Sequence, residues 1–245
     1  MKLFGIGVGP GDPELLTIKA VKALRSSHHI FTASSTKNEY SLALKVAREY
    51  IPPSVTVEAL GFPMTKDPAE LKKAWKKNAL RVFEVLKRVK VASFITLGDP
   101  TLFSTFGYLA RELKDIAPEV EIELIPGITA AQAAASKLGL SLAEGSKGFA
   151  IVSATSPELL KKLLELKDLS LAVYKVYKNK ETIIDLVERA GRNPNYVVIK
   201  CGFPEEKIMK DIKHLKKEKP SYFTLLLTGV NSINHEEEVG GEKNP

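Results

Sequence analysis

Short apolar runs alternate along this chain with longer segments in which apolar residues recur every three or four positions. A short apolar run bounded by turn residues predicts a buried strand, and the longer period predicts an amphipathic helix. Strands are predicted near residues 3–8, 28–32, 55–59, 91–97, 121–125, 148–153, 170–176, 196–200 and 221–227. Helices are predicted near residues 13–26, 40–50, 68–89, 102–115, 129–138, 157–167, 180–190 and 205–217. This alternation is typical of α/β layers built on largely parallel strands.

A polar stretch rich in glycine and serine, GLSLAEGSKG at residues 139–148, divides the chain roughly in half. With 245 residues, of which 44% are hydrophobic, the chain can bury one large core or two modest ones. We therefore expect an N-terminal α/β domain over residues 1–140 and a C-terminal α/β domain over residues 141–230. The last residues, 231–245, show no apolar period and are expected to form a flexible tail.

The net charge of +7 adds one local feature, because residues 66–90 carry nine Lys or Arg against three acidic residues. In this segment apolar residues recur at helical spacing, which predicts an amphipathic helix with a solvated charged face. A surface that attracts an anionic ligand is the alternative. A nucleic-acid-binding module would need aromatic residues between the charges as a stacking platform, and the segment has none in that arrangement. The apolar stripe consists of Leu71, Trp75, Val82, Val85 and Val89.

Several classes of protein are disfavoured by composition. No apolar run approaches the length of a membrane span, and a signal peptide is not apparent, so we expect a cytoplasmic protein without membrane contact. The single cysteine, Cys201, follows the apolar segment YVVIK and is interpreted as a small core thiol. None of the four histidines shares metal-ligand spacing with it, so no protein-bound metal is expected.

The first predicted strand runs into a glycine-rich turn, GIGVGPGDP at residues 5–13, and then into a helix. Asp12 can accept hydrogen bonds at the start of that helix, and Pro13 fits its first turn. This order is the context of a dinucleotide-binding loop. However, Pro10 occupies the position of the third glycine, and no acidic residue lies between Glu14 and Glu39 to hold a ribose. A Rossmann dehydrogenase or Rossmann-type methyltransferase is therefore disfavoured.

Two further strands of the N-terminal half also end in glycine and proline. VASFITLGDPTLFSTF, residues 91–106, passes through Gly98-Asp99-Pro100, and EIELIPGITAAQAAASKLGL, residues 121–140, passes through Pro126-Gly127. Ligands bind at the carboxyl ends of strands in open α/β sheets. Glycine and proline also mark ordinary turns. Three such turns in one half of the chain nevertheless favour a close approach of the backbone to a ligand.

These three segments resemble the successive signatures of the tetrapyrrole methylases, which transfer methyl groups from S-adenosylmethionine to corrinoid and sirohaem precursors. The resemblance covers about residues 1–230. It implies two α/β domains with a cofactor and substrate trough between them, and a homodimer. Further segments resemble the branch that methylates precorrin-2, or its cobalt-bearing counterpart, at C(20). They are FPMTKD (62–67), LAEG (142–145), VYKV (173–176), KCGFPEE (200–206) and YFTLLL (222–227).

The resemblance also implies which residues hold S-adenosylmethionine. In the N-terminal half these are Pro10 of the first loop and Gly98, Asp99 and Leu102 of the second, followed by Thr129 and Ala130 after the third. In the C-terminal half, Lys175, Val176, Gly202 and Thr224 are expected to surround the adenine end. Ser104 and Thr105 are candidates for hydrogen bonds to the cofactor or macrocycle, although their hydroxyls can instead bond within their own helix.

The resemblance assigns no catalytic base. Sirohaem-type relatives have an aspartate just after the second strand, proposed as a base, and Ala33 stands at the corresponding position of this chain.

The main hypothesis from the resemblance is S-adenosylmethionine-dependent methylation at C(20), with a tetrapyrrole substrate and no nucleic acid. Two alternatives stay open: another tetrapyrrole methylase such as uroporphyrinogen III methyltransferase, against which GDPTLFSTF and Ala33 argue, and a basic nucleic-acid-binding module.

Overall fold

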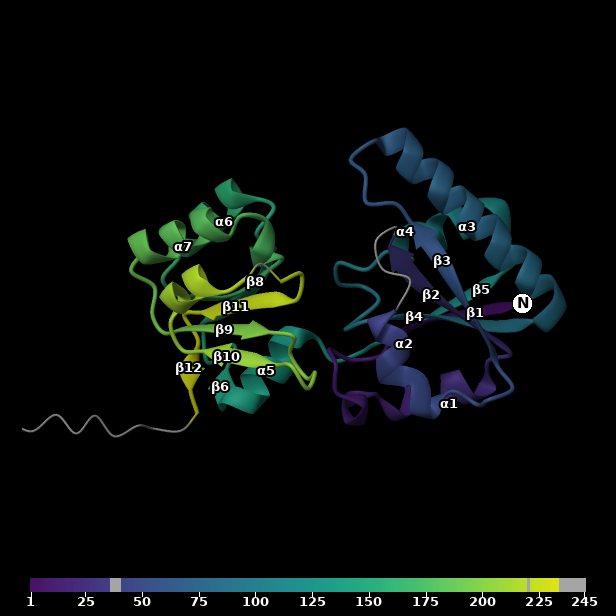
Figure 1. The fold of residues 1–245 in the computed structure, drawn as a ribbon, viewed down its shortest axis with the longest axis horizontal. Coiled ribbons are helices and arrows are strands. Elements are labelled where there is room, and N and C mark those ends of the chain that lie inside the picture. The colour runs from purple at the N-terminus through teal and green to yellow at the C-terminus, as the bar shows by residue number, and fades with distance from the viewer. Residues whose placement is uncertain (36–40, 220, 234–245) are drawn as a thin grey trace, which may run out of the picture. The chain divides into compact units, whose positions relative to one another are not determined.

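The computed structural model describes residues 1–35, 41–219 and 221–233 of the chain. These residues divide after Ala130 into two compact units (Figure 1). The division falls before the boundary expected at residue 140, because helix α5 (Ala130–Leu138) packs with the second unit. Two contacts illustrate this packing: Ala131 N donates to the Tyr174 hydroxyl at 3.1 Å, and Lys137 pairs with Glu206 at 2.6 Å.

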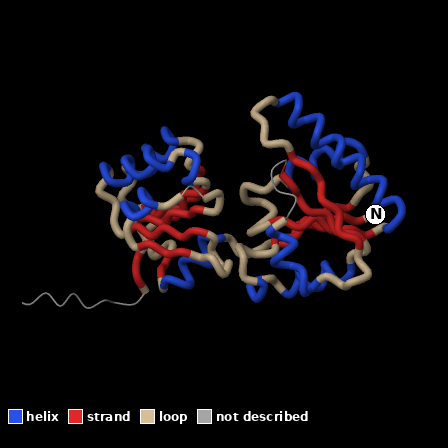
Figure 2. Tube along the Cα trace, in the orientation of Figure 1, coloured by secondary structure: helices blue, strands red, loops and turns tan. Residues whose placement is uncertain are grey.

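The first unit is built on a sheet of five parallel strands in the order β3-β2-β4-β1-β5. Helices α3 and α4 cover one face and α1 and α2 the other, as Figures 1 and 2 show. The strands are β1 (Lys2–Gly7), β2 (His29–Ser35), β3 (Thr56–Phe62), β4 (Val91–Thr96) and β5 (Glu121–Ile125). The helices are α1 (Ile18–Ser26), α2 (Leu42–Ala47), α3 (Pro68–Val89) and α4 (Phe106–Ile116). Each strand predicted in this half is present.

Helix α3 shows why the apolar pattern predicted its position well. Asp67 accepts a hydrogen bond from Ala69 N at 2.9 Å, and Pro68 follows as the first helical residue. The apolar stripe faces the sheet: Val82 and Val85 are fully buried, while Trp75 stacks on Tyr108 of α4 with ring centroids 4.3 Å apart. The lysines project from the other side of the helix and are exposed.

Two of the predicted helices begin later than expected. The segment near 13–26 divides into a short 3-10 helix, Pro13–Leu15, and α1, which Thr17 caps through a hydrogen bond from Ala20 N at 3.1 Å. Helix α4 begins at Phe106 instead of near residue 102, because Phe103 adopts a left-handed φ of 51° that a helix cannot contain.

The second unit has a five-stranded sheet in the order β10-β9-β11-β8-β7. Only β7 and β8 pair in parallel, and β11 runs antiparallel to both of its neighbours. The expectation of largely parallel strands is therefore wrong for this half. The strands are β7 (Gly148–Ser153), β8 (Leu169–Tyr174), β9 (Asn195–Ile199), β10 (Lys207–Met209) and β11 (Thr224–Thr228). Helices α6 (Pro157–Leu164) and α7 (Lys180–Arg189) cover one face, and α5 lies at the other (Figure 1).

The helix predicted near 205–217 is also wrong in its first part. Lys207, Ile208 and Met209 form β10, which pairs with the end of β9, and a 3-10 helix, Ile212–Lys217, follows. Backbone hydrogen bonds to β9 compete with the local helical pattern and prevail over it. In the predicted tail, β12 (Asn231–Ser232) pairs with β6 (Leu140–Ser141), and residues 234–245 lie outside the described part of the chain.

A partly buried polar cluster joins α3 to the edge strand β3 of the first sheet. Arg81 of α3 donates two hydrogen bonds to the Glu58 carboxylate of β3, at 2.7 and 2.9 Å. His29, at the start of β2, is only 7% exposed, and its Nε2 lies 3.1 Å from Glu58 Oε2. Burial lowers the pKa of His29 below its ordinary value of 6.5, although Glu58 opposes that shift. The hydrogen bonds from Arg81 lower the pKa of Glu58 below 4.5.

Acid is therefore expected to destabilise the first unit in two stages. Below about pH 6.5 the unfolded chain binds a proton at His29 that the folded chain does not, so stability starts to fall there. The stability supplied by ionised Glu58 is present above pH 4.5 and is lost as the pH falls through its lower folded pKa. Urea midpoints measured across the acidic range should show both stages. His29→Gln should remove the first, and an unchanged decline in that variant would assign it to another group.

Candidate functional site

Three glycine loops of the first unit meet at the edge of its sheet that the carboxyl ends of the strands form. They follow β4, β1 and β5, which are adjacent and parallel, so their carboxyl ends lie side by side. Beyond β1, Val8 N donates to the Thr96 carbonyl at 3.0 Å. Gly9 and Gly98 then exchange two backbone hydrogen bonds, at 3.3 and 2.7 Å. Pro10 follows this bridge and is buried.

The glycines are needed because the loops approach one another. A Cβ added at Gly7 would lie 2.5 Å from the Gly98 carbonyl oxygen and 2.7 Å from the Gly127 nitrogen. A Cβ at Gly127 would lie 2.8 Å from the backbone of Gly7. The sequence pattern indicated a close approach of backbone at these turns, and the structure shows that three backbones meet there. Gly98 itself has a φ of +68°, and its missing side chain would point into open space.

Asp99 ties the second loop to the third. Its Oδ1 accepts from Thr101 N at 2.7 Å and from the Thr101 hydroxyl, and its Oδ2 accepts from Gly127 N at 2.9 Å. A helix cap alone would use only the first of these interactions. The carboxylate thus fixes the positions of two loops at the sheet edge.

The remaining candidates of the second loop lie around the start of α4. The Ser104 hydroxyl donates to Thr96 Oγ1 at 3.1 Å and accepts from Phe106 N at 3.1 Å, so its bonds are local. Thr105 precedes the helix and makes no capping hydrogen bond with its side chain. Leu102 is half-buried, whereas Phe103 beside it is 45% exposed.

The second unit gathers its candidates at one edge as well. Because β11 runs antiparallel to both β8 and β9, the ends of β8 and β9 lie at the edge where β11 begins. Lys175 and Val176 follow β8, Gly202 follows β9, and Thr224 starts β11 opposite Ile199. Lys175 and Gly202 have left-handed φ values of 60° and 79°, which turn the chain sharply at both strand ends.

The side chains at this edge differ in character. Val176 is fully buried, and Thr224 is 3% exposed and donates its hydroxyl proton to the Ser221 carbonyl at 2.8 Å. Burial, reinforced by the nearby charge of Lys178, lowers the pKa of Lys175. Thr129 and Ala130, which follow the third loop, stand at the start of α5.

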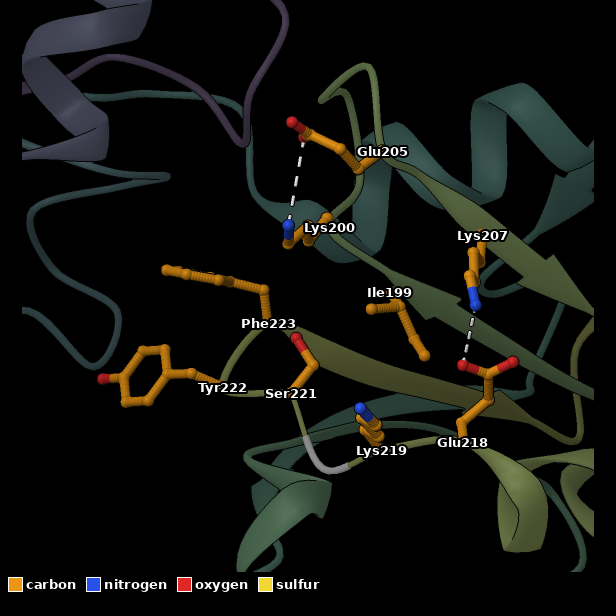
Figure 3. Close-up of a pocket in the computed structure, with 9 residues that line it drawn as sticks. All are labelled: Ile199, Lys200, Glu205, Lys207, Glu218, Lys219, Ser221, Tyr222 and Phe223. Atoms are coloured by element: carbon orange, nitrogen blue, oxygen red, sulfur yellow. Dashed lines mark hydrogen bonds and ion pairs between the residues drawn. The ribbon is translucent and has the colours of Figure 1, made fainter.

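A pocket of about 480 Å³ lies beside the end of β9 and the start of β11. Figure 3 shows Tyr222, which is 50% exposed, on one side, and two ion pairs among the lining residues, Lys200–Glu205 and Lys207–Glu218. The sequence analysis did not predict this pocket, although the segments KCGFPEE and YFTLLL flank it. Its lining residues are Ile199, Lys200, Glu205, Lys207, Glu218, Lys219, Ser221, Tyr222 and Phe223.

Cys201 and Ala33 add no catalytic group. Cys201 is 6% exposed, and burial together with the nearby Glu206 carboxylate raises the pKa of its thiol to about 12. Such a thiol is a poor nucleophile, in keeping with the core role expected for it. Ala33 lies within β2, opposite Leu60 of β3. Among the described residues, no group of three His, Cys, Asp or Glu side chains has the arrangement of a metal site.

The chain is an α/β protein whose candidate residues gather where strands end in each of its two main sheets, and comparison with known proteins identifies the class. The family model of the tetrapyrrole (corrin/porphyrin) methylases matches residues 2–215, and the chain belongs to this family. Within the described residues, no helix is long and apolar enough to cross a membrane.

Two relatives resemble the chain over most of its length. A probable cobalt-precorrin-2 C(20)-methyltransferase from Methanocaldococcus jannaschii is 38% identical over 81% of this chain and 86% of its own. The cobalt-precorrin-2 C(20)-methyltransferase of Salmonella typhimurium is 31% identical over 92% of this chain and 95% of its own.

Solved structures share the fold at lower identity. A cobalt precorrin-4 methyltransferase of cobalamin biosynthesis matches with a TM-score of 0.70 and 20% identity, over 93% of this chain and 94% of that one. A uroporphyrin-III C-methyltransferase from Thermus thermophilus, crystallised with S-adenosylhomocysteine, matches with a TM-score of 0.66 and 22% identity, over 94% and 97%.

Proposed function

We propose that this chain transfers a methyl group from S-adenosylmethionine to C(20) of precorrin-2 or of its cobalt-bearing counterpart, in cobalamin synthesis. The observation that carries the proposal is the similarity of nearly the whole chain to two C(20)-methyltransferases, at 31% and 38% identity. Another position of methylation is the second candidate, because the fold is shared with a uroporphyrin-III methyltransferase.

The strand-end loops fit a cofactor held largely by backbone. At Gly98 a left-handed turn leaves open space where a side chain would stand, so a ligand can approach the main chain there. In the second unit, the buried Thr224 hydroxyl retains lone pairs that can accept a hydrogen bond from an amino group. When bound, S-adenosylmethionine supplies an electrophilic methyl group to an electron-rich carbon of the macrocycle.

The residues of this chain that would hold the cofactor are those at the two sheet edges. Gly98 and Asp99 form the rigid loop of the first unit, beside buried Pro10, and Gly202 with Val176 shapes the turns of the second. Their task is to bind and orient, since proximity and alignment supply much of the barrier reduction in a displacement at methyl carbon.

Product analysis tests the proposal. Purified protein is incubated with S-adenosylmethionine and either metal-free or cobalt-loaded precorrin-2, and the product is examined by mass spectrometry and NMR. We expect one added methyl group at C(20), with one substrate form preferred. A methyl group at another carbon, or transfer to uroporphyrinogen III alone, would replace the C(20) assignment by the second candidate. A gel shift of nucleic acid that survives moderate salt, without methyl transfer, would contradict both.

We further propose that two chains associate in the cytoplasm as a homodimer. Large apolar side chains at the surface of the first unit are consistent with a partner: Ile18 is 76% exposed, Met64 61% and Leu124 48%. Sedimentation equilibrium should give the mass of a dimer, and a monomer at micromolar concentration would contradict this part of the proposal.

Capture of the substrate is expected to depend on salt. The carboxylate arms of precorrin-2 make it a polyanion, whereas S-adenosylhomocysteine is nearly neutral. If the net charge of +7 attracts the substrate, tetrapyrrole affinity should fall as salt rises while S-adenosylhomocysteine affinity changes little. Exposed charges act over only about 8 Å at physiological ionic strength.

Helix α3 offers the matched variant for this prediction. Lys73, Lys77 and Lys87 are exposed on its outer side. Titration of tetrapyrrole into the triple Lys→Gln variant at low and high salt shows whether they contribute. An unchanged salt dependence would assign these lysines to a solvated face, and a flat response in the unmodified protein would contradict electrostatic capture.

A further inference from the structure

The Glu206 carboxylate is nearly buried and binds two parts of the second unit. Its side chain is 10% exposed. One oxygen pairs with Lys137 Nζ of α5 at 2.6 Å, and the other accepts a hydrogen bond from Gly202 N at 2.7 Å. Burial alone would raise the pKa of Glu206, but the hydrogen bonds from Lys137 and the Gly202 amide outweigh it and lower that pKa. The carboxylate is therefore ionised at neutral pH.

The loop that Glu206 holds has an unusual backbone. Lys200 has a φ of 53° and Gly202 a φ of 79°, so two left-handed residues stand within three positions. Inside the loop, Phe203 N donates to the Lys200 carbonyl at 3.0 Å, and Glu206 N to the Phe203 carbonyl at 3.0 Å. A left-handed conformation at a lysine costs free energy and persists only where surrounding contacts impose it. The Glu206–Gly202 hydrogen bond supplies such a contact.

Helix α5 gives this carboxylate a fixed anchor. Near its start, Ala131 N donates to the hydroxyl of Tyr174, the last residue of β8. Near its end, Lys137 reaches Glu206, which follows β9. The helix is thus fastened to the turns after two strands, and these are the turns that carry Lys175, Val176 and Gly202. Its first residue, Ala130, directly follows Thr129 of the third glycine loop.

We propose that Glu206, held by Lys137, is a positioning residue that keeps the Cys201–Gly202 turn in the conformation that receives S-adenosylmethionine. The inference rests on the proposed function, because Gly202 is a cofactor-binding candidate only within it. In this role Glu206 acts through the loop and not by touching the ligand: one of its oxygens pairs with Lys137 and the other accepts from Gly202 N. The pair acts by fixing the loop before binding, so that less ordering is required when the ligand arrives.

Cys201 provides a reporter of this turn that does not require enzyme activity. It is the only cysteine of the chain, lies directly before Gly202, and is 6% exposed with Glu206 beside its thiol. A thiol reagent can modify it only when the turn opens. The rate of modification by an aromatic disulfide reports this opening. Lys137→Met is the decisive variant, because Glu206→Gln also removes the carboxylate that raises the pKa of the thiol.

The experiment compares Glu206→Gln, Lys137→Met and the double variant with the unmodified protein. In each single variant the aromatic disulfide should modify Cys201 at least tenfold faster than in the unmodified protein. Each should also bind S-adenosylhomocysteine about tenfold more weakly, as measured by calorimetry. The double variant should be no worse than either single one, because both changes remove the same interaction. Glu181→Gln breaks an ion pair of the same unit, with Lys180 at 3.3 Å, and should leave both measurements unchanged.

The two readouts separate the inference from the proposed function. Equal Cys201 modification rates in the unmodified protein and in both single variants would overturn the positioning role of Glu206, even if S-adenosylhomocysteine binds well. Failure of the unmodified protein to bind S-adenosylhomocysteine would instead overturn the proposed function. Thermal unfolding of each variant tests for general loss of structure. A variant whose Cys201 is modified faster, but whose melting temperature equals that of the unmodified protein, has a local change in the turn.

Discussion

Replacing Gly127 with alanine is expected to weaken S-adenosylhomocysteine binding at least tenfold and to lower the rate of methyl transfer by about a hundredfold, the loss that a misplacement of about 1 Å produces. The added methyl group would overlap the Gly98 carbonyl and lie 2.8 Å from the backbone of Gly7. Neither neighbour is a flexible side chain, so the loops themselves must separate. Calorimetric titration and single-turnover methyl transfer measure the two effects.

Gly61 supplies the matched control. It lies in β3 of the same sheet, and a methyl group added there has nothing within 4 Å. Gly61→Ala should therefore bind and react like the unmodified protein. If Gly127→Ala also binds S-adenosylhomocysteine normally, the contact among the three loops is unimportant for the ligand, and the glycines serve only the packing of the sheet edge.

The second large effect is expected at Asp99. Asp99→Ala removes the acceptor for the amides of Thr101 and Gly127 and so releases the second loop from the third. We expect S-adenosylhomocysteine affinity to fall at least tenfold while the chain still folds. Leaving a half-buried amide without a partner costs about 1–3 kcal/mol, which denaturant unfolding can measure.

Asp67 separates this role from that of a simple cap. It accepts from Ala69 N at 2.9 Å at the start of α3, as Asp99 does from Thr101, but its described hydrogen bonds do not connect two loops. Asp67→Ala should lower stability by about 1 kcal/mol without changing ligand affinity. If Asp99→Ala gives the same result, Asp99 is only a cap and its bond to Gly127 has no role in binding.

The predicted positions of most strands and helices agree with the structure because they depend on local patterns. The apolar stripe of α3 repeats at the helical period, and the bounds of 68–89 predicted from it agree with the helix Pro68–Val89, which ends where Lys90 adopts a φ of 66°. The strands β1 and β4 are short, largely apolar segments, β5 alternates glutamate with apolar residues, and glycine or proline lies at or just after the end of each. The local pattern of apolar and polar residues is enough to recognise such elements.

The candidate site was predictable only where a loop follows a strand directly. Gly98, Asp99 and Gly127 were identifiable as strand-end residues, and the parallel order β4-β1-β5 places them together. Glu206 gave no such signal, because an acidic residue in a polar loop is usually solvated. Its significance comes from Lys137, which lies far away in the sequence and near in space.

The sequence by itself therefore determined the α/β alternation, the family, and the glycines at three strand ends, since each depends on residues close together in the chain. The tertiary structure decided what those glycines approach, which is one another, and turned residues 207–209 from a predicted helix into a strand against β9. It also decided the antiparallel course of β11 and the burial of Glu206. These features depend on partners that a local pattern does not contain, because strand pairing and the burial of charge are set by long-range contacts.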